Sequence, residues 1–239
     1  MNPTTSAEVA SIIDHSILHP TYTDTDLEKQ CAIAVKLNTA TVCIKPYHVG
    51  RAAELLKESS VAICAVIGFP HGSSNIEVKV FEALQVIVDG AHEVDMVVNV
   101  GKALQGDWEY IHCEIEAIHD ACVENKVALK VIFETDYINR EEDIVKLCQI
   151  CNECNVEFVK TSTGYGFLKD LDGKFYYNGA TSANIELMRK HCSPEIQIKA
   201  AGGIRNLDQL LLMVKSGATR VGATASEEIV AEAYKRFGI

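Results

Sequence analysis

The sequence predicts a single-domain (β/α)8 TIM barrel over residues 1–239, and three observations support this fold class. Short apolar runs alternate eight times with longer segments that have helical spacing of apolar residues, which is typical of repeated βα units around a parallel sheet. No Pro/Gly-rich linker divides the chain, and one barrel domain takes about 250 residues. The alternative, an open doubly wound sheet, usually carries a glycine fingerprint after its first strand, and IIDHSILHP contains no glycine.

Each expected strand is a short apolar run that ends at a turn or a polar loop. The strands are expected at residues 11–16, 39–45, 61–69, 93–100, 127–134, 156–162, 195–201 and 218–223. The helices are expected at residues 25–37, 46–58, 75–89, 103–125, 140–154, 181–191, 206–216 and 225–236. One connection is unusually long, at residues 164–179. Such loops usually carry function or form a small hairpin, and the GKFYYNG segment suits either an edge strand or a surface flap.

The composition is that of a globular protein with an acidic surface, since 48% of the residues are hydrophobic and the net charge is −11. This charge argues against a nucleic-acid partner, because affinity for phosphate backbones comes from clustered Lys and Arg. No apolar stretch approaches the ~20 residues of a membrane helix. The first residues also lack the charged and apolar regions of a signal peptide. We therefore expect a cytoplasmic protein with no membrane partner.

The nine cysteines are expected to be reduced core residues rather than disulfides. Most of them lie in apolar stretches, as Cys43 and Cys64 do. Cys148, Cys151 and Cys154 have the spacing of iron–sulfur ligands, but the first two share a helix face with neighbouring aliphatic residues, and no fourth cysteine follows at ferredoxin-like spacing.

Alternation along the strands places charged side chains inside the barrel. In EVDMVVN the apolar residues face the helices, so Asp95 faces inward, and the same pattern sends Lys160 and Lys199 inward. All three lie near the carboxyl ends of their strands, where barrel active sites are found. A lysine in apolar surroundings favours its neutral amine, more so beside a second ammonium, and a neutral amine can form a Schiff base. The two lysines therefore predict a nucleophilic amine.

Three further inward charges are Asp14, Lys130 and Glu134. Buried charges are costly unless they pair or catalyse, and for Lys130 with Glu134 we expect an internal salt-bridge network. The histidines form no tight group with carboxylates, so no metal site is predicted.

Two glycine-containing loops predict an anion site. Barrel phosphate sites are usually built from the loops after strands seven and eight together with a helix N-terminus. Those loops here are GGIR at residues 202–205 and GAT at residues 222–224. Glycine lets backbone N–H groups approach a phosphate, so we expect a phosphorylated substrate next to Lys199.

In these motifs the chain resembles the deoxyribose-phosphate aldolases, a family of class I aldolases. The matching segments are IDHSILHPT, TATVCIKPYHV, AVIGFPHG, GAHEVDMVVNVG, LKVIFET, FVKTSTGYG, IKAAGGIR and RVGATAS. The resemblance implies a reversible cleavage of 2-deoxy-D-ribose 5-phosphate to acetaldehyde and D-glyceraldehyde 3-phosphate, in deoxyribonucleotide catabolism. It also implies that no metal or organic cofactor is used and that the protein is a homodimer.

The resemblance implies a role for each matched residue. Lys160 is the Schiff-base lysine, and Lys199 is the second lysine, which perturbs the first and helps proton transfer. Asp95 is the acid/base partner, acting through water, and Asp14 supports that relay. The residues implied for phosphate binding are Gly164, Gly202, Gly203, Gly222 and Thr224.

Several positions depart from the family pattern. His19 stands where relatives carry lysine, and the loop at residues 167–178 is longer than usual, which could alter pocket access or the dimer contact. Ala225 replaces a serine that some relatives use for phosphate, so Thr224 and backbone N–H groups are expected to carry more of that site. Some relatives end in a tyrosine that assists protonation, and that role is not transferred to Tyr234.

Three other functions stay open at this point. Another Schiff-base aldolase with a different phosphorylated or keto acid substrate would use the same lysines, because pocket shape sets the substrate. A metal-dependent lyase or isomerase on the same fold would lose its activity on chelation. A non-catalytic sugar-phosphate sensor is disfavoured, because both lysines and Asp95 are present.

Overall fold

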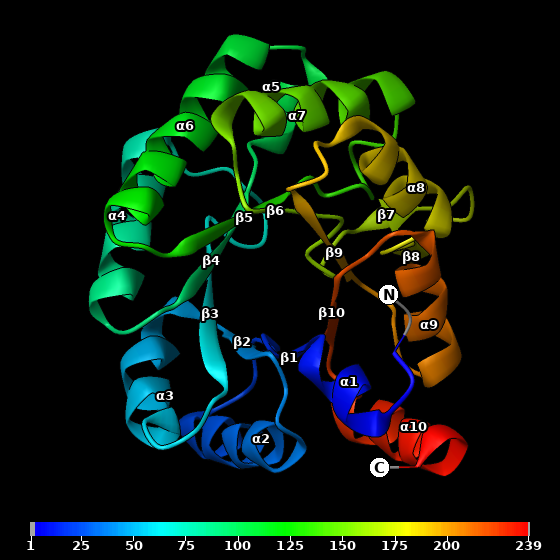
Figure 1. Ribbon diagram of the computed structural model, residues 1–239. Helices are drawn as coiled ribbons and strands as arrows, with labels where there is room; N and C mark the ends of the chain where they lie inside the picture. Colours follow the sequence, from blue (N-terminus) through cyan, green and yellow to red (C-terminus); the bar gives the residue numbers. More distant parts are fainter. Residues whose placement is uncertain (1–2, 239) are drawn as a thin grey trace.

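The predicted barrel is confirmed by the computed structural model, which describes residues 3–238 (Figure 1). Eight parallel strands close in the order β1-β10-β9-β6-β5-β4-β3-β2. They span Ile13–Ile17 (β1), Thr41–Ile44 (β2), Ala62–Ile67 (β3), Glu93–Val97 (β4), Ala128–Ile132 (β5), Phe158–Lys160 (β6), Gln197–Ala201 (β9) and Arg220–Ala223 (β10). Each strand lies within a few residues of its expected bounds. Residues 1, 2 and 239 of the expected domain lie outside the described residues.

Helices surround the barrel on its outside (Figure 1). They span Ser6–Ser11 (α1), Asp24–Leu37 (α2), Val49–Leu56 (α3), Ile76–Val88 (α4), Val100–Leu104 (α5), Trp108–Glu124 (α6), Glu141–Cys154 (α7), Ser182–His191 (α8), Leu207–Ser216 (α9) and Ser226–Phe237 (α10), and a 3-10 turn, Pro46–His48 (η1), precedes α3. Within residues 3–238, none of these helices has both the length and the apolar character needed to cross a bilayer.

Two helices differ from expectation. The helix α1 was not expected; Thr5 caps it by accepting a hydrogen bond from the Glu8 N–H, and the first strand therefore starts later, at Ile13. The helix expected at residues 103–125 is divided into α5 and α6. Gly106 has a positive φ of 80° after α5, and the Asp107 side chain then caps α6, so the backbone restarts at that point.

The barrel strands carry apolar side chains on their outward faces and charged side chains on their inward faces. Val94 and Met96 of β4 and Val159 of β6 are fully buried against the helices, as expected for outward-facing residues. Full burial of side chains of this size contributes about 1.5–3 kcal/mol each. The inward faces of the same strands carry Asp95 and Lys160, which are exposed by 0% and 2%. The barrel therefore encloses charged groups where aliphatic side chains usually pack.

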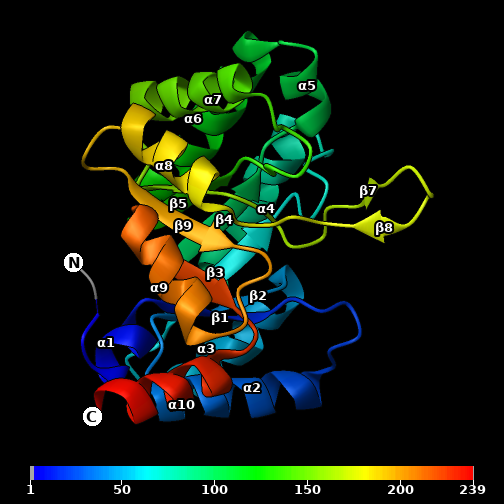
Figure 2. The same cartoon turned by 90° about the vertical axis from the view of Figure 1, so that its right-hand side faces the viewer.

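The long loop after β6 forms a small hairpin, which was one of the expected alternatives. Its strands, Leu168–Lys169 (β7) and Phe175–Tyr176 (β8), pair antiparallel in a separate two-stranded sheet. Figure 2 shows that this hairpin projects from the barrel, away from the surrounding helices.

Candidate active site

Sheet register brings the two predicted catalytic lysines together. Lys160 in β6 and Lys199 in β9 are Cα partners on adjacent parallel strands. Side chains at paired positions of a parallel sheet point to the same face, here into the barrel. Both lysines are almost fully buried; Lys160 is the last residue of β6, and Lys199 lies at the centre of β9. The prediction that they face inward as neighbours is confirmed.

One carboxylate, that of Asp95, joins the lysines of the barrel interior. Its Oδ2 accepts hydrogen bonds from Lys160 Nζ at 2.8 Å and from Lys199 Nζ at 2.7 Å, while its Oδ1 lies 3.1 Å from Lys130 Nζ. Burial by itself would raise the pKa of Asp95, but the charges of the three lysines outweigh burial and hold the pKa well below its usual range. Lys160 therefore does not lie in the purely apolar surroundings that its flanking residues indicated.

A second carboxylate holds Lys199 from its other side. Asp14 Oδ2 lies 2.6 Å from Lys199 Nζ, and Asp14 in turn pairs with the guanidinium of Arg220. Burial would lower the pKa of Lys199, but Asp14 and Asp95 outweigh it and raise that pKa well above its usual value. Lys199 therefore keeps its positive charge, and Asp14 lies beside it.

The expected internal salt-bridge network is confirmed for Lys130, but the prediction that Glu134 belongs to it with Lys130 is wrong. Lys130 pairs with Glu93 and Asp95 instead. The strand β5 ends at Ile132, and Glu134 has a positive φ of 55°, so the strand alternation that placed its side chain beside Lys130 no longer applies. Its carboxylate instead accepts hydrogen bonds from the backbone N–H and the hydroxyl of Thr163.

Two members of the charged network were missed in the sequence. Arg220 at the start of β10 bridges Asp14 and Glu93, with its Nη1 3.2 Å from Glu93 Oε1. Alternation could have found both residues, because Glu93 lies two positions before the inward Asp95 and Arg220 lies two positions before the inward Gly222. Both lie at the amino ends of their strands, away from the end where the site was sought.

Two buried thiols adjoin the same carboxylates. Cys64 Sγ donates to Asp95 Oδ1 at 3.0 Å, and Cys43 borders the pocket described below. Both cysteines are free and buried, as expected.

Within residues 3–238, two groups of side chains are spaced to hold a metal ion. They are Cys43, Cys64 and Asp95, and Asp14, Cys64 and Glu93. A metal ion at either position would have to compete with the lysine or arginine side chains that already pair with these carboxylates.

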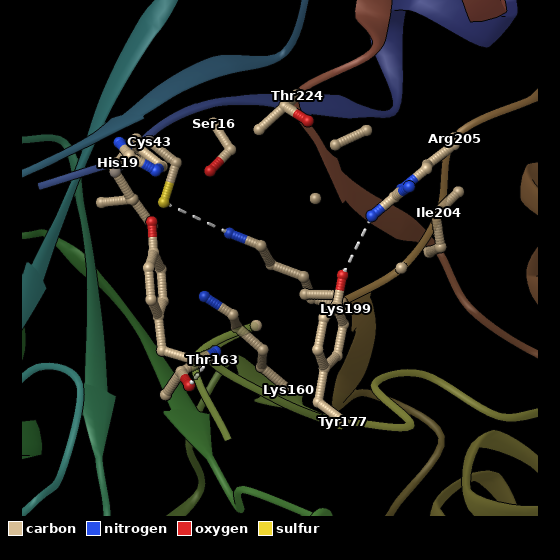
Figure 3. Close-up of a pocket in the computed structure, with 18 residues that line it drawn as sticks. Ser16, His19, Cys43, Lys160, Thr163, Tyr177, Lys199, Ile204, Arg205 and Thr224 are labelled. Carbon is tan, nitrogen blue, oxygen red and sulfur yellow. Dashed lines mark hydrogen bonds between the residues drawn. The ribbon is translucent and has the colours of Figure 1, made fainter. Parts of the chain in front are cut away.

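A cavity of about 220 Å³ opens at the carboxyl ends of the strands, and Lys160 and Lys199 both reach it (Figure 3). All five residues predicted for phosphate binding line this cavity: Gly164, Gly202, Gly203, Gly222 and Thr224. Arg205 lines it as well, whereas Asp14, Asp95 and Lys130 do not. The charged side chains at the cavity wall are therefore basic, which suits an anionic ligand.

The loop after β9, which lines the cavity, shows why glycine is required at two of the predicted phosphate-binding positions. Gly202 and Gly203 have positive φ values of 98° and 80°, a backbone conformation that favours glycine. A Cβ atom on Gly202 would also lie 2.8 Å from the Cα of Gly179. Consecutive residues in such turns can direct backbone N–H groups toward an anion.

Other residues of the cavity wall were not singled out as site residues. Ser16 follows the inward Asp14 by two positions in β1, so strand alternation could have indicated it. Thr163 and Tyr177 lie in loops, where no periodic signal exists.

Replacing Glu134 with Gln is expected to change the pH dependence of stability. Burial raises the pKa of Glu134 to about 7. Below pH ~4.5 the carboxyl is protonated in both the folded and the unfolded chain, so it contributes no pH dependence there. Between pH ~4.5 and ~7 only the unfolded chain loses the proton, so stability falls by up to about 3 kcal/mol as pH rises, and stays at that lower level above pH ~7.

This effect is measured by denaturant unfolding of both proteins from pH 4 to 8. We expect Glu134→Gln to remove the fall, so that the difference in unfolding free energy between the variant and the original chain grows with pH. A difference that is constant across this range would contradict the raised pKa.

The chain is similar to known aldolases in both sequence and structure. Residues 8–232 match the model of the DeoC/LacD family aldolases. The deoxyribose-phosphate aldolase of Clostridium perfringens (strain 13 / Type A) is 44% identical over 219 residues, which cover 92% of each chain. Among solved structures, the aldolase QR15 has a TM-score of 0.86 at 33% identity, covering 95% of this chain and 96% of its own. The deoxyribose phosphate aldolase of Aeropyrum pernix, described as tetrameric, has a TM-score of 0.86 at 26% identity, covering 98% and 94%.

Proposed function

The chain belongs to the DeoC/LacD family of aldolases, and from this premise we propose that it cleaves 2-deoxy-D-ribose 5-phosphate reversibly to acetaldehyde and D-glyceraldehyde 3-phosphate through a Schiff base on Lys160. The name of the Clostridium perfringens relative supports this substrate. The basic cavity, with its glycine loops, supports a phosphorylated ligand.

The observation that carries the choice of nucleophile is the unequal pairing of the three buried lysines. Lys130 does not reach the cavity. Lys199 reaches it but is held by two carboxylates, at 2.6 Å from Asp14 and 2.7 Å from Asp95. Lys160 reaches it and pairs with Asp95 alone, at 2.8 Å. Of the three, Lys160 therefore loses the least ion pairing when it gives up a proton to become a nucleophile.

The proposed reaction begins when the Lys160 amine attacks the C1 aldehyde of the open-chain sugar and water leaves, forming an iminium. Removal of the C3 hydroxyl proton breaks the C2–C3 bond, and the iminium accepts the electron pair as an enamine. D-Glyceraldehyde 3-phosphate then departs. Protonation of the enamine at C2 and hydrolysis of the iminium release acetaldehyde. The ion pairs of Asp95 with Lys160 and Lys199 support these two residues as the groups that exchange the protons, with Asp95 acting through water.

A coupled assay tests this function, with 2-deoxyribose 5-phosphate as substrate and detection of released D-glyceraldehyde 3-phosphate. We expect turnover that survives exhaustive chelation. Absence of turnover with this substrate, but turnover with another phosphorylated aldol, would leave a Schiff-base aldolase of different specificity. Loss on chelation with recovery on metal addition would contradict the mechanism.

Replacing Lys199 with Leu is expected to move the activity profile to higher pH. The raised pKa of Lys199 keeps it positively charged through the neutral range, and that charge disfavours a second ammonium at position 160. In the Leu variant, this neighbouring charge no longer opposes an ammonium at position 160. We expect the acid limb of the kcat/KM profile to rise by about one pH unit or more.

Lys199→Arg serves as the matched variant, because it keeps the charge and should keep the position of the acid limb. If Lys199→Leu and the original chain have the same pH profile, Lys199 does not tune Lys160.

Use of this reaction in deoxyribonucleotide catabolism stays a prediction, as do the homodimer and the cytoplasmic location. The first two rest on the family resemblance, and the location rests on the lack of signal-peptide features and of a membrane-length apolar stretch in the sequence.

A further inference from the structure

The base of the β7–β8 hairpin is fixed against the rest of the barrel. Asp136 Oδ1 accepts hydrogen bonds from the backbone N–H groups of Asn178 at 2.6 Å and Gly179 at 3.1 Å. A Cβ atom on Gly179 would lie 2.4 Å from the Gly202 carbonyl oxygen, and one on Gly166 would lie 2.8 Å from the Asp136 Cβ. Both ends of the hairpin are therefore packed too closely for a side chain, and one of them lies directly on the glycine loop of the anion site.

Large apolar side chains of the hairpin are exposed to solvent, whereas one of its side chains lines the cavity. Leu171 is fully exposed, and Phe167 and Phe175 are exposed by 60% and 58%. Of residues 167–178, Tyr177 is the one that lines the cavity (Figure 3). It directly precedes the two residues that Asp136 holds, so the fixed base positions its ring.

Arg205 sets the direction of the Tyr177 hydroxyl. Arg205 Nη2 donates a hydrogen bond to Tyr177 Oη at 3.4 Å (Figure 3). The guanidinium has only donors, so the phenol oxygen must act as the acceptor in this contact, which leaves its own proton for another acceptor. The Tyr177 ring also lies over the glycine loop, with its Cε2 3.9 Å from where a Cβ of Gly203 would stand.

We propose that Tyr177, fixed by the hairpin base, is a specificity-determining residue that donates a hydrogen bond to the phosphate of the substrate, with its hydroxyl oriented by Arg205. This inference rests on the proposed function, because it assumes a phosphorylated ligand in the same cavity. The hairpin then forms a fixed wall of the cavity at the side where the phosphate of the substrate binds. Its contribution is to binding and selection, and the bond-breaking steps at Lys160 do not use it.

The test compares Tyr177→Phe with the original chain on 2-deoxyribose 5-phosphate and on 2-deoxyribose without the phosphate. We expect kcat/KM for the phosphorylated sugar to fall on the order of tenfold, mainly through KM, as for the loss of a hydrogen bond to a charged group. The value for the unphosphorylated sugar should not change. Tyr176→Phe is the matched control, because Tyr176 is 45% exposed, pairs with Leu168 and does not line the cavity.

Equal losses on both sugars would assign Tyr177 a merely structural role, and no loss on either would remove it from the phosphate site; both results overturn the inference. Binding of inorganic phosphate, measured by calorimetry, separates this inference from the proposed function. If the original chain binds phosphate and Tyr177→Phe binds it about tenfold more weakly, the inference stands even if the sugar phosphate is not cleaved. Phosphate affinity that is unchanged in the variant overturns it without reference to turnover.

Discussion

Incubation with acetaldehyde and borohydride is expected to leave a stable ethyl group on Lys160, because reduction traps the iminium as a secondary amine. Peptide mass spectrometry identifies the labelled lysine. Lys130 is equally buried, but it does not reach the cavity and should stay unlabelled. Lys199 should also stay unlabelled, because its two carboxylate partners keep it as an ammonium.

The variant Lys160→Ala should lose both the label and the activity, with kcat falling by about 10⁴-fold or more, as for removal of a covalent nucleophile. The control is Lys57→Ala, which removes an exposed lysine at the end of α3 and should leave both measurements unchanged. A label on Lys199, or a Lys160→Ala protein that retains activity, would exclude the proposed nucleophile.

Replacing Asp95 with Asn is expected to reduce both stability and activity. The carboxylate is fully buried and contacts three lysines, so its neutralisation leaves their charges poorly compensated in the barrel interior. Removal of one partner from a buried ion pair typically costs about 3–5 kcal/mol. Loss of the proposed acid/base group should lower kcat by about 10²- to 10⁴-fold. Denaturant unfolding and steady-state kinetics measure the two effects.

A second substitution separates the two effects. Lys130 pairs with Asp95 but does not reach the cavity, so adding Lys130→Met to Asp95→Asn removes one of the uncompensated charges. We expect the double variant to regain part of the lost stability and none of the activity, with a clear coupling energy in the double-mutant cycle. An unfolding midpoint that Asp95→Asn leaves unchanged would show that the three lysines do not depend on this carboxylate.

The part of the site that was predictable is the part that lies on strands. Asp95, Lys160 and Lys199 were identified because side chains in a strand alternate between two faces, and a closed barrel gives those faces different surroundings. Arg220 and Glu93 obey the same rule, although they lie at the opposite ends of their strands. The rule stops where a strand stops, so the side chain of Glu134, beyond the end of β5, was assigned the wrong partner.

The position of Tyr177 could not have been predicted in this way. It depends on contacts between segments that are far apart in the sequence, namely the Asp136 carboxylate with the Gly179 N–H, and Gly179 with Gly202. No local periodicity encodes such contacts. The sequence indicated that residues 164–179 form an unusually long connection suited to a function or a small hairpin, but not which of its side chains reaches the cavity.

The pairing of Lys160 with Lys199 across β6 and β9 also bears on how such an enzyme could acquire new substrates. The spacing of the two amines is set by the hydrogen-bonded ladder between neighbouring strands, so insertions in the surrounding loops need not disturb it. The chain carries a ten-residue helix and a whole hairpin between these two strands, and the lysines still lie side by side. Laboratory selection for altered specificity should therefore accept changes in the hairpin far more readily than changes in either strand.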